Sequence, residues 1–92
     1  MEGRFHRNPG VEIGPLKSET VLFNPNNNKF CVLNTSAAFL WGRLERPSTV
    51  GELASELCTS FEVAEDQALR DAREVVQQLL EAEFVQVQPP TS

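Results

Sequence analysis

The side chains that could act as nucleophiles, bases or metal ligands are few and far apart. His6 is the only histidine, Cys31 and Cys58 are the only cysteines, and the chain has no tyrosine. Neither cysteine has another Cys or His at the spacing of a zinc site, and no serine or cysteine has a base nearby in the sequence. The sequence therefore predicts no catalytic residue, no metal site and no cofactor.

The two cysteines and the hydropathy of the chain bear on where the protein works. We expect Cys31 and Cys58 to be buried or half-buried free thiols in a reducing cytosol, whereas a disulfide between them would require an oxidising compartment. No apolar run approaches the ~20 residues of a membrane span, and Met1–Gly10 lacks the hydrophobic stretch of a signal peptide. We therefore expect a cytoplasmic protein with no membrane partner.

The charge balance argues against nucleic acid as a partner. The chain has 8 Lys and Arg against 13 Asp and Glu, a formal net charge of −5. Proteins bind nucleic acid largely by neutralising phosphates with basic side chains. From Pro47 to Leu69 the sequence contains no Lys or Arg.

The first part of the chain predicts a small sheet. Its 92 residues are enough for one domain with one hydrophobic core. Met1–Gly10 is polar and without periodicity, which predicts a flexible lead-in. Three short apolar stretches follow, with an Asn-rich turn between the second and the third. These predicted strands are Val11–Ile13, Thr20–Phe23 and Phe30–Leu33.

Three helices are predicted after the strands. Asn34, Thr35 or Ser36 can cap a first helix that Pro47 ends, and Ser48 or Thr49 opens a second one, with Glu52 placed as in a capping box. A third helix is predicted over 64–82, and a short strand near Val85, with a tail over 88–92. The predicted fold class is α+β, an N-terminal three-stranded antiparallel sheet followed by a three-helix bundle, winged-helix-like.

Order and spacing of several motifs resemble the PqqD-like family. Leu33–Ala38 with Trp41 is similar to its L-N-x-x-A-x-x-x-(I/W) signature, and Thr49–Leu57 matches its T-V-x-E-(I/L)-A-x-x-L element. Val76, Leu79 and Leu80, followed by Phe84-Val85, look like its closing helix and tail. The resemblance covers about 11–87, which would be a single binding domain. Two turns depart from the family pattern: Glu45-Arg46-Pro47 replaces a turn such as Asp-Gly, and Glu83 replaces a glycine.

The resemblance implies a peptide-binding function. Members of this family bind the N-terminal leader of a ribosomally synthesised precursor peptide and present it to a modifying enzyme or a leader protease. The leader adds as a strand to the edge of the sheet and lies between the third strand and the third helix. The product could be a lasso peptide, pyrroloquinoline quinone or another modified peptide, and the protein a monomer or a strand-edge dimer.

The resemblance also implies which residues bind the leader. The apolar residues of the third helix cover an arc of roughly 160°, wider than one core contact needs. One margin of that arc could therefore serve the groove, with Arg73 available to a leader carboxylate. Either alternating set of the edge strand could line the groove, and the edge would be lost if Val85–Val87 paired beside it. The predicted peptide-binding residues are Lys29, Phe30, Cys31, Val32 and Leu33 on the strand and Leu69, Arg73, Val76 and Leu80 on the helix.

Two other functions fit the same elements. A winged-helix DNA-binding regulator would place Arg70 and Arg73 of the third helix in a groove of DNA, but acidic residues surround both arginines on that helix. An adaptor would bind a folded enzyme through the apolar strip, which is compatible with leader binding.

Overall fold

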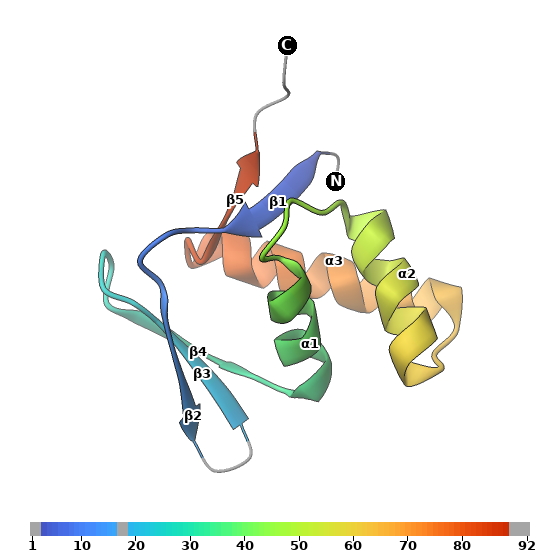
Figure 1. Ribbon diagram of the computed structural model, residues 1–92, viewed down its shortest axis with the longest axis horizontal. Coiled ribbons are helices and arrows are strands. Elements are labelled where there is room, and N and C mark those ends of the chain that lie inside the picture. Colours follow the sequence, from blue (N-terminus) through green and yellow to red (C-terminus); the bar gives the residue numbers. More distant parts are fainter. Residues whose placement is uncertain (1–2, 17–18, 89–92) are drawn as a thin grey trace.

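The computed structural model describes residues 3–16 and 19–88, and its first feature is a three-stranded sheet (Figure 1). The strands are β2 (Glu12–Leu16), β3 (Glu19–Asn24) and β4 (Lys29–Leu33), antiparallel in the order β2-β3-β4. Three helices follow: α1 (Thr35–Arg43), α2 (Val50–Phe61) and α3 (Glu65–Glu81). The predicted α+β class with an N-terminal antiparallel sheet is confirmed, and the winged-helix likeness stays a prediction.

A second, two-stranded sheet joins the two ends of the described chain. β1 (Arg4–Arg7) pairs antiparallel with β5 (Val85–Gln88), with Phe5 opposite Val87. This corrects the expected lead-in over 1–10 and moves Gln88 from the tail into a strand, while 89–92 lie outside the described residues. Phe5 is the physical reason why this segment is a strand and not a flexible lead-in. Its side chain is only 1% exposed, and its main chain exchanges two hydrogen bonds with Ser48, of 2.8 and 2.9 Å.

The helices begin where the sequence predicts. The Asn34 side chain accepts a hydrogen bond from the Ala37 N–H at 2.8 Å. Thr49 and Glu52 form the predicted capping box, with hydrogen bonds of 3.0 and 2.9 Å. The Glu52 carboxylate accepts a hydrogen bond from the Thr49 N–H, and this bond holds the pKa of the carboxyl below its usual range. These local bonds satisfy amide groups that the first turn of a helix leaves free.

The core lies between the helices and the inner face of the three-stranded sheet. Leu22 and Leu33 of the sheet are buried in one cluster with Leu40 and Trp41 of α1 and with the inward residues of α3. The guanidinium of Arg7 stacks on Trp41, 4.7 Å from the ring centroid, and its Nε donates to the Trp41 carbonyl at 3.0 Å. Trp41 is therefore a core residue that β1 covers.

A network of asparagines holds the β3–β4 hairpin against the end of α3. Buried Asn24 donates to the Glu83 carbonyl at 2.9 Å, and Asn27 donates to the Ala82 carbonyl at 3.0 Å. Glu83 adopts a left-handed φ of 62°, so this turn keeps the conformation typical of glycine without having one. The network fixes β4 relative to α3, between which the candidate site lies.

Replacing Glu62 by glycine is expected to stabilise the domain. Glu62 ends α2 in the left-handed region, with φ 51° and an exposed side chain. Glu62→Gly removes the steric conflict of the Cβ atom and should raise the free energy of unfolding by about 0.5–1 kcal/mol. Urea denaturation followed by circular dichroism measures this gain. The control Glu62→Ala removes the same charge but keeps Cβ, so an equal gain in both variants would contradict the explanation.

Candidate functional site

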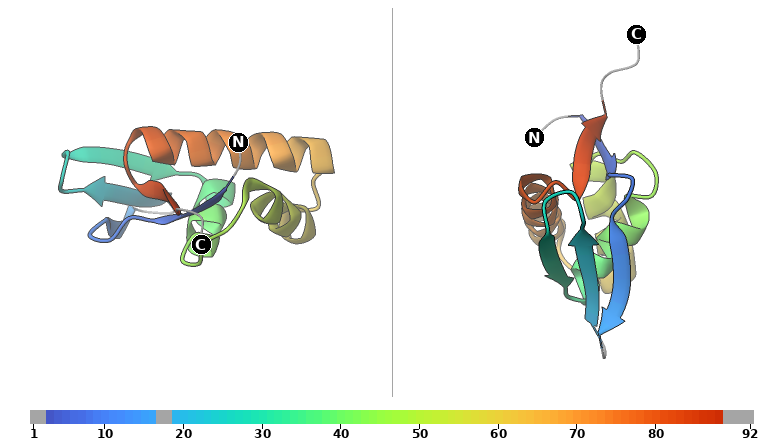
Figure 2. Two further views of the ribbon diagram at one scale, coloured as in Figure 1. Left: turned by 90° about the horizontal axis from the view of Figure 1, so that it is seen from above. Right: turned by 90° about the vertical axis from the view of Figure 1, so that its left-hand side faces the viewer.

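β4 is an edge strand with one side of its backbone open. It pairs with β3 along its full length, and β5, the rival partner considered from the sequence, pairs with β1 instead. Within 3–16 and 19–88, no strand pairs with the other side of β4 (Figure 2). β2 forms the opposite edge but contains Pro15, which has no N–H to offer an added strand. Strand addition is therefore favoured at β4.

A groove runs between this open edge and α3. It has a volume of about 240 Å³, and the start of α1 closes one of its ends. Val32 and Leu33 line it from the strand, and Asp71, Glu74, Val75, Gln78 and Leu79 line it from α3. A strand added to β4 would thus lie with one set of its side chains against α3.

The two alternating sets of β4 side chains have different surroundings. Cys31 and Leu33 point toward the core, whereas Phe30 and Val32 are 69% and 56% exposed on the other face, and Lys29 is exposed at the start of the strand. The inward set is therefore the one that packs on the helices. Burial raises the pKa of the Cys31 thiol, which keeps it protonated at neutral pH and poorly nucleophilic.

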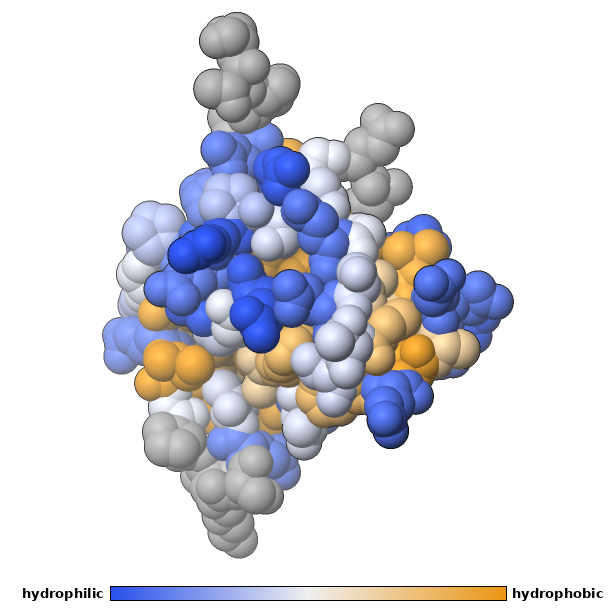
Figure 3. All heavy atoms as spheres, turned by 45° about the vertical axis from the view of Figure 1, so that its right-hand side comes forward, coloured by the Kyte–Doolittle hydropathy of each residue, from blue (hydrophilic) through white to orange (hydrophobic). Residues whose placement is uncertain are grey.

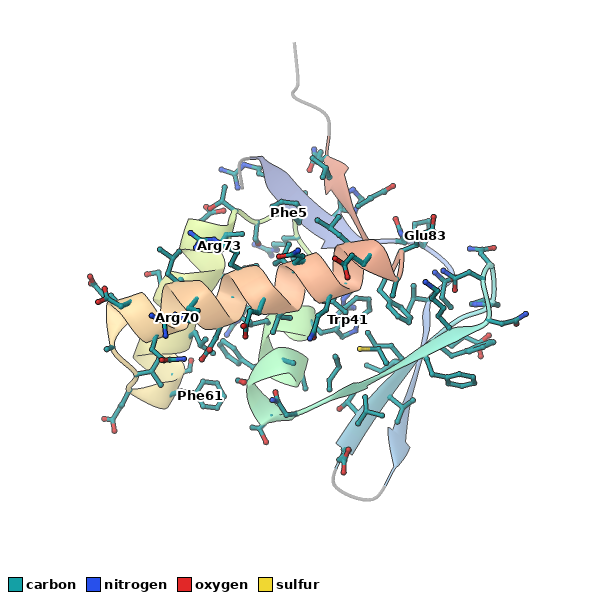
Figure 4. All side chains as sticks on the ribbon, turned by 180° about the vertical axis from the view of Figure 1, so that it is seen from behind. Phe5, Trp41, Phe61, Arg70, Arg73 and Glu83 are labelled. Carbon is teal, nitrogen blue, oxygen red and sulfur yellow. The ribbon has the colours of Figure 1, made fainter. Side chains whose placement is uncertain are left out.

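The structure places the groove on the other margin of α3 from the one predicted. Val76 is fully buried in the core and cannot contact a ligand. The other three predicted residues lie on the opposite side of the buried stripe from the groove: Leu69, Arg73 and Leu80. At 100° per residue they are roughly 180° around the helix from the groove residues. Figure 4 shows the labelled Arg73 on the side of α3 away from β4. The structure thus brings Val32 and Leu33 to the groove, but none of the four predicted helix residues.

The groove margin of α3 is acidic rather than basic. Asp71 and Glu74 border the groove, and Asp71 accepts a hydrogen bond from Gln67 at 2.8 Å. The predicted pairing of a leader carboxylate with Arg73 therefore has no support at this margin. The sequence signal for the margin that lines the groove is Val75, the apolar residue beside the core stripe, but its acidic neighbours made that side look solvent-facing.

The candidates for reactive chemistry are not assembled into a centre. His6 lies in β1 and contacts the amide of Gln86 at 3.2 Å. Cys31 and Cys58 are free thiols. In the described part of the chain, no three His, Cys, Asp or Glu side chains are grouped to hold a metal ion. No helix there is long and apolar enough to span a bilayer.

Residues 19–85 match the family model described as coenzyme PQQ synthesis protein D (PqqD). The match runs from β3 to the first residue of β5, and so includes both walls of the groove. The chain belongs to the PqqD family. The resemblance stated from the sequence is thus confirmed, whereas nothing in the family match supports the DNA-binding alternative.

Two solved structures share the PqqD-type fold seen here. One, described as "Lasso peptide synthetase B1 complexed with the leader peptide", is 24% identical over 89% of this chain and 96% of that chain, with a TM-score of 0.75. The other, "TbiB1 in Complex with the TbiA(beta) Leader Peptide", is 19% identical over 92% and 99%, also with a TM-score of 0.75. A search of curated proteins gives no match. At these identities the structural likeness shows the shared fold.

Proposed function

We propose that this PqqD-family domain binds the leader segment of a ribosomally synthesised precursor peptide. The leader joins β4 as an added strand and lies against α3. The observation that carries the proposal is the open edge of β4 beside the groove on α3. Two proteins of the same fold were solved with leader peptides, which supports the same ligand class here.

The chain acts in this proposal as a binding domain and not as a catalyst. It presents the bound precursor to a separate modifying enzyme or leader protease in the cytoplasm. The binding unit spans 11–87, with β1 bracing it, and the product is a lasso peptide, pyrroloquinoline quinone or a related modified peptide. The open β4 edge also permits a strand-edge dimer in the absence of leader.

Strand addition with apolar anchors can supply micromolar affinity. Four or five strand hydrogen bonds contribute about 0.5–1.5 kcal/mol each, and two or three apolar anchors about 1.5–3 kcal/mol each. Association and ordering cost about 6–10 kcal/mol or more, so a net free energy of about −8 kcal/mol, which corresponds to a Kd of about 1 μM, requires contributions near the upper end of these ranges.

Titration calorimetry with a synthetic leader peptide tests the function. The peptide is taken from the precursor gene encoded nearest to this one, and a scrambled peptide of equal composition is the control. We expect saturable one-to-one binding with Kd on the order of 1 μM for the leader only. Equal heats from both peptides, or retention of the domain on duplex DNA at moderate salt, would contradict the proposal.

Amide exchange of β4 should report the added strand. In the free domain, alternate β4 amides face the open edge and exchange fast, while β3 amides are paired on both sides. Bound leader is expected to slow the fast β4 amides at least tenfold, because strand pairing closes them. Hydrogen exchange followed by NMR measures this, with β3 as the internal control. Protection that arises at β2 instead would move the site to the opposite edge.

A further inference from the structure

The face of the three-stranded sheet that points away from the helices carries a patch of four apolar side chains. We call Val21, Phe23, Phe30 and Val32 the outer patch. Of these four, only Val32, on the edge strand, also lines the groove. They form two cross-strand pairs between β3 and β4, Val21 with Val32 and Phe23 with Phe30, and the two phenyl rings lie 4.6 Å apart. Figure 2 shows the helices on the opposite side of this sheet. On the side of the molecule shown in Figure 3, by contrast, hydrophobic areas are interrupted by hydrophilic ones.

The outer patch is displaced toward the open edge. On the side of β2 it ends at Glu12 and Gly14, which stand opposite Phe23 and Val21. A Cβ atom at Gly14 would meet no atom within 4 Å, so the sheet surface there is open. Phe30 and Val32 on the edge strand are more than half exposed, whereas Val21 and Phe23 on β3 are only partly exposed. Within the outer patch, the least covered side chains are therefore those nearest the free edge of β4.

A strand added to β4 would cover this part of the sheet. Successive side chains of a strand point to opposite faces, so one set enters the groove and the other lies beside Phe30 and Val32. Directly opposite side chains in antiparallel strands have Cβ atoms about 4.5–5.5 Å apart, close enough for contact. The area of four side chains on two strands is far smaller than the ~800 Å² that each partner of a stable protein complex buries. It is about the area that one added strand would cover.

We propose that the outer patch is the second half of the leader site and binds the outward-facing side chains of the leader strand. This inference rests on the proposed function and specifies its ligand. The leader segment paired with β4 carries apolar residues at outward positions, which pack on Phe30 and Val32, as well as at positions facing α3. Recognition then extends over both faces of the added strand, and a leader apolar on one face only is a poor ligand.

Phe30→Thr tests the outer patch without touching the groove. Phe30 is exposed and does not line the groove, and threonine keeps the preference for a strand. We expect the variant to stay folded, with a melting temperature lowered by at most about 8 °C because the Phe23 ring contact is lost. It should bind the synthetic leader about tenfold more weakly, because an apolar contact with the leader strand is lost. The matched control is Ile13→Thr, which removes an apolar side chain that is also more than half exposed, at the other edge, and should change affinity less than twofold.

A set of leader peptides, each with one residue changed to serine, identifies the contact. Serine at one outward position should lower the affinity for the wild-type domain about tenfold. The same peptide should bind Phe30→Thr as tightly as the unchanged leader does, because the two side chains contact each other in the wild-type complex. Equal leader affinity of wild type and Phe30→Thr would overturn the outer-patch proposal alone. A wild-type domain that binds no leader would overturn the proposed function with it. If Phe30→Thr instead converts a dimer to a monomer in sedimentation with leader affinity unchanged, the occupant is a second copy and the proposal falls.

Discussion

Val75→Asp is expected to weaken leader binding about 100-fold while the domain stays folded. Val75 lines the groove from α3 and is half-buried, so an aspartate at this position reaches water in the free domain. A bound leader strand would cover that carboxylate beside Asp71 and Glu74, without a cation to pair with it. Burying a poorly satisfied charge costs about 3 kcal/mol or more, which corresponds to about 100-fold in Kd. Titration calorimetry with the synthetic leader measures the change.

Leu69→Asp is the matched control for this substitution. Leu69 is 38% exposed on the opposite margin of α3, where the sequence alone placed the site. The same charge introduced there should leave leader affinity within about twofold, since surface substitutions away from a contact have small effects. If Leu69→Asp abolished binding and Val75→Asp did not, the sequence-based margin would be right and the groove identified here would be wrong.

The sequence predicted the elements whose signals are local. The capping box of Thr49 and Glu52 lies within one turn of helix, and the Asn-rich turn before Lys29 lies within one hairpin. The β1 strand was missed because its pairing partners are about 80 positions away and Phe5 is its one apolar residue. Four residues with a single buried side chain give no periodicity to detect.

The state of the β4 edge depended on that missed strand. From the sequence, the terminal strand near Val85 could pair with β4 or elsewhere, and only the first choice would close the edge. β5 pairs with β1 in a separate two-stranded sheet after the buried Phe84, and it does not pair with β4. The strand that could have closed the edge is thus used in a contact between the two ends of the described chain.

The margin of α3 that faces β4 is also fixed by distant contacts. Helical periodicity identifies the buried stripe of α3 but treats its two margins alike. The choice follows from where the β3–β4 hairpin sits, and the bonds of Asn24 and Asn27 to the carbonyls of Ala82 and Glu83 set that position. Hydropathy favoured the margin with Leu69 and Leu80, whereas the fold turns the margin with Val75 toward β4.

Val76→Asp is expected to unfold the domain rather than to act on the groove. Val76 is 0% exposed and lies in the core with Leu79 and Leu40. An aspartate there has no water and no partner, at a cost of several kcal/mol, while a domain of this length has roughly 5–14 kcal/mol of stability in total. We expect loss of the cooperative unfolding transition, or a melting temperature at least 15 °C lower, since 1 kcal/mol corresponds to about 4–8 °C in a domain this size. Circular dichroism during heating measures both.

The two neighbouring valines therefore separate stability from recognition. Val75→Asp should lower the melting temperature far less than Val76→Asp does, because Val75 is only half-buried at the margin of the core and its carboxylate reaches water in the free domain. Val76→Asp introduces the same group one position away, on the buried stripe, so its loss of leader binding would follow from loss of folding. A Val76→Asp variant that melts like the wild type and still fails to bind leader would place Val76 in the groove and contradict the packing of α3 described here.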